Sequence, residues 1–261
     1  MKVVLFCGGL GMRLREFSET IPKPMVNIGH RPILWHVMRY YAHYGHKEFI
    51  LCLGHKGELI KEYFLNYKET VSNDFVLSDG GRKVELLNSD IHNWKITFVD
   101  TGLNSNVGQR LKAVERHLEG QDVFLANYTD VLSDVPLPDL IQFFTQHDTI
   151  ASFICVPPTQ SFHLVKLING GLVSSIKHVS QAGVRINGGF FVFKKQIFDY
   201  IKNGEELVYE PFQRLIDEKQ LIAYKHEGFW ACMDTFKERQ LLEDMYTRGE
   251  TPWEVWKYKT D

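Results

Sequence analysis

The N-terminal stretch of this chain is the feature that most limits what it can fold into. Residues 3–7 read Val-Val-Leu-Phe-Cys. A run of five apolar residues, two of them β-branched, predicts a buried parallel strand, because such a strand has no wet face. Gly8, Gly9 and Gly11 follow at once, and without side chains the backbone can turn sharply and present bare N–H groups to an anion. The stretch therefore predicts a phosphate-binding loop after the first strand of an α/β protein.

Two cations follow this loop. Arg13 supplies a planar fork of donors and Lys23 a point charge, so the two would contact an anion in different ways. A solvated surface position is the alternative for both. Because cations beside a glycine loop have an obvious anionic partner, we expect both to bind phosphate.

The glycine pattern does not decide the matter alone, because glycine-rich turns also follow strands in α/β proteins that bind nothing there. Two nucleotide-binding motifs are excluded by spacing. The Rossmann fingerprint would need glycine at the position of Leu14, and the P-loop would need Gly-Lys-Ser/Thr, which is absent from the sequence.

The rest of the chain alternates strand and helix patterns, which predicts an α/β fold with a mostly parallel sheet flanked by helices. We expect further strands over residues 49–53, 95–99, 123–126, 150–156, 185–193 and 221–224. We expect helices over residues 32–41, 58–67, 109–117, 137–147, 196–202, 210–218 and 235–247. Two stretches with central glycines, 68–93 and 164–176, predict antiparallel hairpins.

Composition limits the partners. The net charge of −2 over 261 residues gives no basic surface for nucleic acid or anionic membrane, so we expect a small-molecule ligand. The four cysteines lie far apart without metal-ligand spacing and are expected to be reduced. Because no long apolar stretch predicts a signal peptide or a membrane helix, we expect a cytoplasmic protein.

Two aspartates could hold a metal ion. Asp130 follows the strand expected over 123–126, and ligands in open α/β sheets sit beyond the carboxyl ends of strands. A carboxylate beside a triphosphate would be repelled unless a cation such as Mg²⁺ lay between them. The alternative for Asp130 is a helix cap or turn, and Asp234 could be the N-cap of the last helix.

The glycine loop, Arg13-Leu14 and Lys23-Pro24 together resemble the signature of sugar-1-phosphate nucleotidylyltransferases, and among them the glucose-1-phosphate cytidylyltransferases. Further matching motifs lie at residues 22–36, 61–67, 99–102, 186–192, 228–235 and 252–253. The resemblance covers almost the whole chain in order. It implies one nucleotidyltransferase domain over 1–261, with a Rossmann-like, mostly parallel mixed sheet and a smaller antiparallel sugar-binding lobe. Residues 1–135 would form the nucleotide-binding half and residues 136–261 the sugar-binding half with the C-terminal helix.

The resemblance also implies a reaction. An oxygen of a sugar-1-phosphate would attack the α-phosphorus of a nucleoside triphosphate with Mg²⁺ bound, most simply CTP and glucose-1-phosphate giving CDP-glucose and pyrophosphate. Asp130 and Asp234 would hold Mg²⁺, Arg13 would stabilise charge on the pyrophosphate side, and Lys23 would contact both phosphates. The implied nucleotide-binding residues are Phe6, Gly8, Gly9, Leu10, Gly11, Met12, Asn104, Ser105, Arg110 and Thr129. The implied sugar-binding residues are Lys177, His178, Asn187, Gly188 and Trp230.

The chain departs from the family at several positions. Met12 stands where the family usually has Thr, Ser161-Phe162-His163 replaces Arg-Phe-Gly, and Lys177-His178-Val179 replaces Glu-Lys-Pro, so the acidic sugar ligand is gone. These changes leave two alternatives open: a different sugar or other phosphate acceptor, or a non-catalytic nucleotide-binding regulatory protein. Trp230 could belong to the core instead, and Gly188-Gly189 could mark a β-bulge.

We also expect a homo-oligomer, because the insertion at 68–93 and the aromatic tail with Trp253, Trp256 and Tyr258 are candidate contact surfaces.

Overall fold

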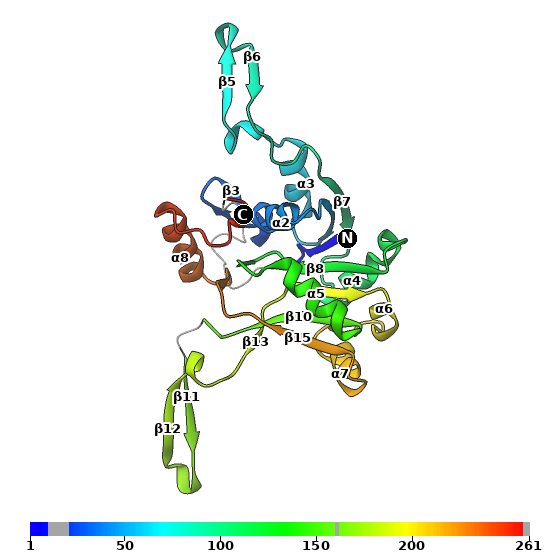
Figure 1. Cartoon of the computed structure of the whole chain (residues 1–261), viewed down its shortest axis with the longest axis vertical. Helices are drawn as coiled ribbons and strands as arrows, with labels where there is room; N and C mark the ends of the chain where they lie inside the picture. The colour runs from blue at the N-terminus through cyan, green and yellow to red at the C-terminus, as the bar shows by residue number, and fades with distance from the viewer. Residues whose placement is uncertain (10–20, 160–161, 258–261) are drawn as a thin grey trace.

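A computed structural model describes residues 1–9, 21–159 and 162–257. Its centre is an eight-stranded sheet in the order β13-β10-β14-β8-β1-β4-β7, with β15 also paired to β10 (Figure 1). The strands are β1 Val3–Phe6, β4 Glu48–Leu53, β7 Lys95–Asp100, β8 Val123–Tyr128, β10 Ala151–Val156, β13 Ile186–Asn187, β14 Phe191–Lys194 and β15 Leu221–Lys225.

The sheet is mixed, with a parallel block at one side. Strands β8, β1, β4 and β7 run parallel, and Val4 of β1 lies opposite Ile50 and Ala126. Strand β14 runs antiparallel between β8 and β10. This arrangement confirms the predicted α/β fold with a mostly parallel sheet.

The helices cover both faces of this sheet. They are α2 Ile33–His43, α3 Gly57–Leu65, α4 Val107–Ala113, α5 Leu137–His147, α6 Ile197–Tyr200, α7 Glu210–Asp217 and α8 Phe236–Thr247. Val3 and Leu5 of β1 pack into one core cluster with residues of α2 and α5, whereas Val4 and Phe6 pack into the other with residues of α4 and α7. Both faces of β1 are therefore buried, as its uninterrupted apolar sequence predicts.

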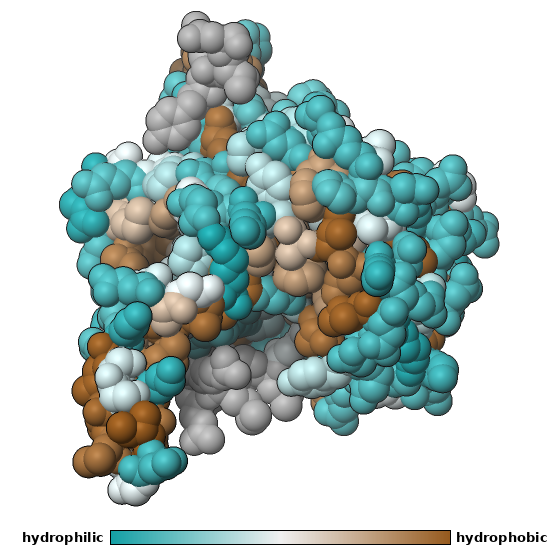
Figure 2. Space-filling view, turned by 60° about the horizontal axis from the view of Figure 1, so that its bottom comes forward, coloured by the Kyte–Doolittle hydropathy of each residue, from teal (hydrophilic) through white to brown (hydrophobic). Residues whose placement is uncertain are grey.

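Two hairpins extend from opposite sides of the body (Figure 1). One pairs β5 Phe75–Ser78 with β6 Lys83–Leu86, and the other pairs β11 His163–Leu167 with β12 Val173–His178. Both were predicted. Apolar side chains gather on the β11–β12 hairpin, at the lower left of Figure 2, so this hairpin presents an apolar surface to solvent in the single chain.

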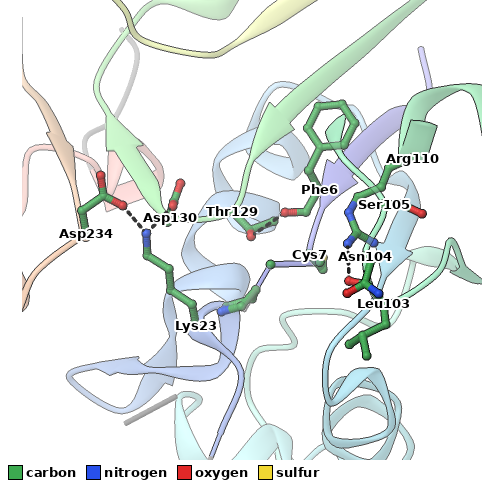
Figure 3. A pocket seen from close by; sticks show the side chains of 13 residues that line it. Phe6, Cys7, Lys23, Leu103, Asn104, Ser105, Arg110, Thr129, Asp130 and Asp234 are labelled. Atoms are coloured by element: carbon green, nitrogen blue, oxygen red, sulfur yellow. Dashed lines mark hydrogen bonds and ion pairs between the residues drawn. The ribbon is translucent and has the colours of Figure 1, made fainter. Parts of the chain in front are cut away.

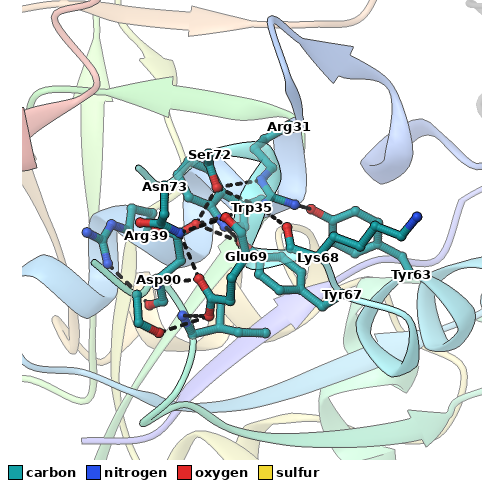
Figure 4. Close-up of polar contacts among 12 residues, drawn as sticks. Arg31, Trp35, Arg39, Tyr63, Tyr67, Lys68, Glu69, Ser72, Asn73 and Asp90 are labelled. Carbon is teal, nitrogen blue, oxygen red and sulfur yellow. Dashed lines mark hydrogen bonds and ion pairs between the residues drawn. The ribbon is translucent and has the colours of Figure 1, made fainter. Parts of the chain in front are cut away.

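A polar network fixes the foot of the β5–β6 hairpin to the N-terminal end of α2 (Figure 4). Arg31, 4% exposed, donates to the Tyr63 hydroxyl and the Lys68 carbonyl and lies 3.7 Å from the Asp90 carboxylate. The Glu69 carboxylate accepts from the backbone N–H of Asp90 at 2.8 Å. Both strands of the hairpin are thus tied to the body where they leave it.

Two short antiparallel ribbons were not predicted: β2 Asn27–Ile28 with β3 Arg31–Pro32, and β9 Val131–Ser133 with β16 Trp230–Cys232. Two predicted elements are interrupted, and the helix expected over 196–202 spans only Ile197–Tyr200. The strand over 185–193 breaks at Gly188–Phe190, where Gly189 and Phe190 have positive φ. The helix over 109–117 ends at Ala113 and continues as the 3₁₀ turn Glu115–Leu118. Among the described residues, no helix has the length and apolar character to cross a membrane.

Candidate functional site

A cleft of about 540 Å³ opens beyond the carboxyl ends of β1 and β8. The described residues that line it are Phe6, Cys7, Gly8, Gly9, Lys23, Pro24, Leu103, Asn104, Ser105, Arg110, Thr129, Asp130 and Asp234. Figure 3 shows Lys23, Asp130 and Asp234 on one side of the cleft and the side chains of Leu103, Asn104, Ser105 and Arg110 on the other. The cleft therefore gathers most of the predicted nucleotide-binding and metal-binding residues.

Lys23 lies between the two predicted metal ligands. Its Nζ donates to Asp130 Oδ2 and to Asp234 Oδ1, both at 2.5 Å. Burial alone would lower the pKa of Lys23, but the attraction of Asp130 and its hydrogen bonds to both carboxylates outweigh burial and raise that pKa. Lys23 is therefore charged at neutral pH.

The β9–β16 ribbon explains why these two acids meet. Asp130 directly precedes β9, Asp234 follows β16, and Val131 pairs with Cys232. The backbone N–H of Met233 also donates to the Asp130 carbonyl at 2.8 Å. Strand pairing thus sets the separation of two carboxylates that lie 104 positions apart in the chain.

Helix capping does not occupy either carboxylate. Thr235 is the N-cap of α8: its Oγ1 accepts from the Glu238 N–H, and the Glu238 carboxylate accepts from the N–H groups of Thr235 and Asp234. Helix α5 begins at Leu137, well past Asp130. The alternative of a cap is wrong for both acids, and both side chains turn to Lys23 instead.

The donor set fits a hard divalent cation. Two carboxylate oxygens converge on one point, where Lys23 Nζ lies. No cluster of three His, Cys, Asp or Glu side chains with metal-binding geometry exists among the described residues. A two-carboxylate site suits Mg²⁺, which keeps several waters and completes its shell with phosphate oxygens.

Arg110 organises the other side of the cleft. It is 1% exposed, and its Nη1 donates to Thr101 Oγ1 at 2.7 Å and to the carbonyls of Leu53 and Gly102 at 3.0 Å each. Burial lowers the pKa of Arg110. A Cβ on Gly8 would lie 2.1 Å from the guanidinium. Gly8 is therefore required for the loop and the guanidinium to pack together.

Two predicted hydroxyl ligands are already used within the protein. Ser105 Oγ donates to the Thr101 carbonyl at 2.5 Å, and Thr129 Oγ1 donates to the Phe6 carbonyl at 3.0 Å. Each therefore holds a loop or strand end in place at the cleft. The side chain of Asn104 and the backbone of Gly9 are exposed there, so they are accessible to a ligand.

Of the predicted sugar-binding residues, Asn187 and Gly188 lie at the break between β13 and β14, and Trp230 begins β16; the described residues that line the cleft include none of the three. The Trp230 indole N–H donates to the Gly188 carbonyl at 2.9 Å, and Trp230 is buried. A Cβ on Gly188 would lie 2.8 Å from Ile154 Cγ1. The glycine here accommodates close packing within the protein, and a sugar-binding role for the three residues stays a prediction.

Lys177 and His178 lie on β12, and the described residues that line the cleft do not include them. Their hairpin points away from the body (Figure 1). Because β12 ends at His178, both residues lie at the end of the hairpin that joins the body, and a sugar-binding role for them stays a prediction.

Four predicted residues, Leu10, Gly11, Met12 and Arg13, lie outside the described residues, as do Ser161 and Tyr258. Their roles stay predictions. Conversely, sequence reasoning missed Cys7, Pro24 and Leu103 as cleft-lining residues. Cys7 and Pro24 adjoin predicted site residues, and Leu103 lies between the Gly102 turn and Asn104, so position in the loops was the signal that could have found them.

The chain matches known proteins over nearly its whole length. It is 37% identical over 257 residues to glucose-1-phosphate cytidylyltransferase of Salmonella typhimurium, covering 98% of this chain and 100% of the relative. It is 36% identical over 258 residues to a probable glucose-1-phosphate cytidylyltransferase of Bacillus subtilis, with the same coverage. Mannose-1-phosphate guanyltransferase of Pichia angusta is 25% identical over 254 residues, covering 94% of this chain and 63% of that protein.

Solved structures share the fold. A UDP-glucose pyrophosphorylase complexed with UDP-glucose superposes with a TM-score of 0.70 at 16% identity, covering 95% of this chain and 98% of that one. A putative glucose-1-phosphate thymidylyltransferase from Bacillus anthracis gives a TM-score of 0.66 at 15% identity, covering 94% of each chain. The model of the family described as nucleotidyl transferase matches residues 2–245. This chain, whose cleft brings Gly8 and Gly9 together with Lys23 and the paired acids, belongs to the nucleotidyl transferase family.

Proposed function

We propose that this enzyme joins CTP and glucose-1-phosphate to form CDP-glucose and pyrophosphate. The observation that carries the proposal is the convergence of Lys23, Asp130 and Asp234 at one side of a cleft whose other side is built from Gly8 and the Arg110-braced loop. The relatives at 36–37% identity, which carry the name glucose-1-phosphate cytidylyltransferase, support this choice of substrates.

The reaction would be an in-line displacement at phosphorus. A phosphate oxygen of glucose-1-phosphate forms a bond to the α-phosphorus of CTP, the bond between the α-phosphorus and its bridging oxygen breaks, and pyrophosphate leaves. Bound Mg²⁺, held by Asp130 and Asp234, would neutralise charge on the phosphates. Lys23 would bring the two anionic reactants together, and the backbone N–H groups after β1 would orient the polyphosphate.

Base selection would depend on the loop at residues 102–105, which Arg110 holds by hydrogen bonds to its carbonyls. The Arg110 guanidinium fixes the carbonyls of Gly102 and Leu103 at the cleft. Carbonyls and backbone N–H groups held in place can pair with the amine and the carbonyl of cytosine. Because unsatisfied polar groups disfavour the wrong base, this loop is where we place the preference for CTP.

An initial-rate assay of pyrophosphate release tests the proposal. CTP, UTP and dTTP would each be combined with glucose-1-phosphate and with other hexose-1-phosphates, and the products would be identified by mass. We expect the highest kcat/KM for CTP with glucose-1-phosphate. No pyrophosphate release with any pair, together with measurable CTP binding, would favour a regulatory nucleotide-binding protein. A higher kcat/KM for another hexose-1-phosphate would reassign the acceptor, in line with Lys177-His178 in place of the family's Glu-Lys pair.

We also propose that the enzyme works as a homo-oligomer in a reducing compartment such as the cytoplasm. Apolar residues of both hairpins are exposed, among them Leu77, Val84, Leu167 and Leu172. They need a cover of similar character, which the same hairpin of a second copy would supply. The four cysteines form no disulfide, which fits reducing conditions.

A further inference from the structure

We propose that Lys23 stands in for the metal ion in the free enzyme: its ammonium holds Asp130 and Asp234 together and gives them up when a divalent ion enters with the nucleotide. The inference deepens the proposed function and rests on it. Lys23 would thus have two successive partners, first the two acids and then phosphate.

The geometry allows one cation at this point. Lys23 Nζ lies 2.5 Å from an oxygen of each carboxylate, whereas Mg²⁺ needs its oxygen ligands at about 2.0–2.1 Å. An ion bound to the same two oxygens would occupy nearly the same place as the ammonium. Two cations so close in a partly buried cleft repel strongly, so the ammonium and a divalent ion compete for the pair.

The backbone around Lys23 is held, and the side chain can move. Lys23 lies between Pro22 and Pro24 and is the first residue of the 3₁₀ turn Lys23–Met25. The Met25 N–H donates to the Pro22 carbonyl at 2.8 Å. Two flanking prolines restrict the backbone. The flexible four-carbon stem of lysine still lets the ammonium swing within the cleft, which a planar guanidinium would do less readily.

Competition between the Lys23 ammonium and the metal ion for the two carboxylates predicts that the metal ion and the nucleotide bind cooperatively. A divalent ion alone must displace the ammonium and leave it without an anionic partner, which weakens binding. When CTP is present, its phosphates receive the ammonium, so the ion enters more easily. By reciprocity of binding free energies, CTP also binds better with the ion present.

Direct ion binding tests this. Mn²⁺, used as the probe without nucleotide or sugar, would be titrated by calorimetry and by electron paramagnetic resonance into the wild type and Lys23→Met. Removing the ammonium takes away the group that competes with the ion for the two carboxylates, so we expect Lys23→Met to bind Mn²⁺ at least tenfold more tightly. Lys95→Met, which removes an exposed partner of Glu48, should leave Mn²⁺ affinity unchanged.

Two further variants keep the result interpretable. Lys23→Gln, uncharged but still a hydrogen-bond donor, takes the place of Lys23→Met if that variant does not fold. Adding Asp130→Asn to either should abolish the gain, because the ion needs both carboxylates. Equal or weaker Mn²⁺ binding after loss of Lys23, or a gain that survives Asp130→Asn, would overturn the inference. Neither result depends on base or sugar, so the proposed reaction is judged separately by its product assay.

Discussion

At the scale of single residues, the cleft depends on the contact between Gly8, which has no side chain, and the buried guanidinium of Arg110. Gly8 leaves room for the Arg110 guanidinium, which in turn holds the carbonyls of Leu53 and Gly102. A methyl group at Gly8 would have to push the guanidinium away from these carbonyls. Gly9, one position later, has open space where a Cβ would stand.

Gly8→Ala should therefore destabilise the enzyme, whereas Gly9→Ala should not. Overpacking of this kind costs about 1–3 kcal/mol, and displacement of Arg110 should also raise KM for CTP. Urea unfolding and initial rates measure the two effects. Equal stability of the two variants would show that Arg110 can shift at no cost.

The two acids give a second prediction at this scale. Asp130→Asn and Asp234→Asn keep shape and hydrogen bonding but lose charge, so each should lower kcat/KM by about 100- to 1,000-fold, the size typical of removing one electrostatic stabiliser. Asp139→Asn, on the exposed side of α5, is the matched control and should keep full activity. Full activity of Asp130→Asn would remove Asp130 from the metal site.

At the scale of elements, the sequence predicted the regular pieces better than the contacts between them. Helix α5 agrees with its predicted range, and β1, β7 and β8 agree within two residues. The spacing of apolar residues within each of these segments can be read from the segment itself, without knowledge of the rest of the fold. The three-residue strands β9 and β16 carry no such period. Their pairing joins segments about 100 residues apart, and pairing at that distance leaves no local mark. The sequence could therefore nominate Asp130 and Asp234 but not show what holds them together.

Lys23 illustrates the same limit. Its position after a glycine loop indicated an anionic partner, and phosphate was the expected one. Its partners in the structure are two carboxylates. The sequence identified the cation, while the partner depends on tertiary structure and on what is bound.

The foot of the β5–β6 hairpin gives a prediction for an element. Arg31→Met would leave the buried Asp90 carboxylate without its cation, which costs about 3–5 kcal/mol for buried pairs. The double variant Arg31→Met/Asp90→Asn should cost less than the sum of the single variants, because both remove one interaction. Urea unfolding measures the cycle, and limited proteolysis should show faster cleavage within residues 68–91. Strict additivity would mean that the two side chains contribute independently.

At the scale of the whole molecule, the exposed hairpins give a prediction about assembly. Leu172→Glu and Leu77→Glu place a charge on the apolar surface of each hairpin, where the leucines are 66% and 58% exposed. Each should shift the enzyme toward smaller species in light scattering coupled to size-exclusion chromatography. Lys166→Glu adds a carboxylate to the same β11–β12 hairpin without replacing an apolar side chain, and should leave the mass unchanged. A monomeric wild type would contradict the expectation of a homo-oligomer.

The place of β14 in the sheet has a consequence for how the chain could be divided. This strand follows the β11–β12 hairpin in the sequence, yet it fills the position between β8 and β10, which both precede that hairpin. The segments before and after the hairpin are therefore interlocked, and each carries one acid and one strand of the β9–β16 ribbon. Peptides cut at the exposed turn Asn169–Gly171 should associate by fragment complementation. Recovery of divalent-ion binding on mixing would then report that the severed sheet had closed again.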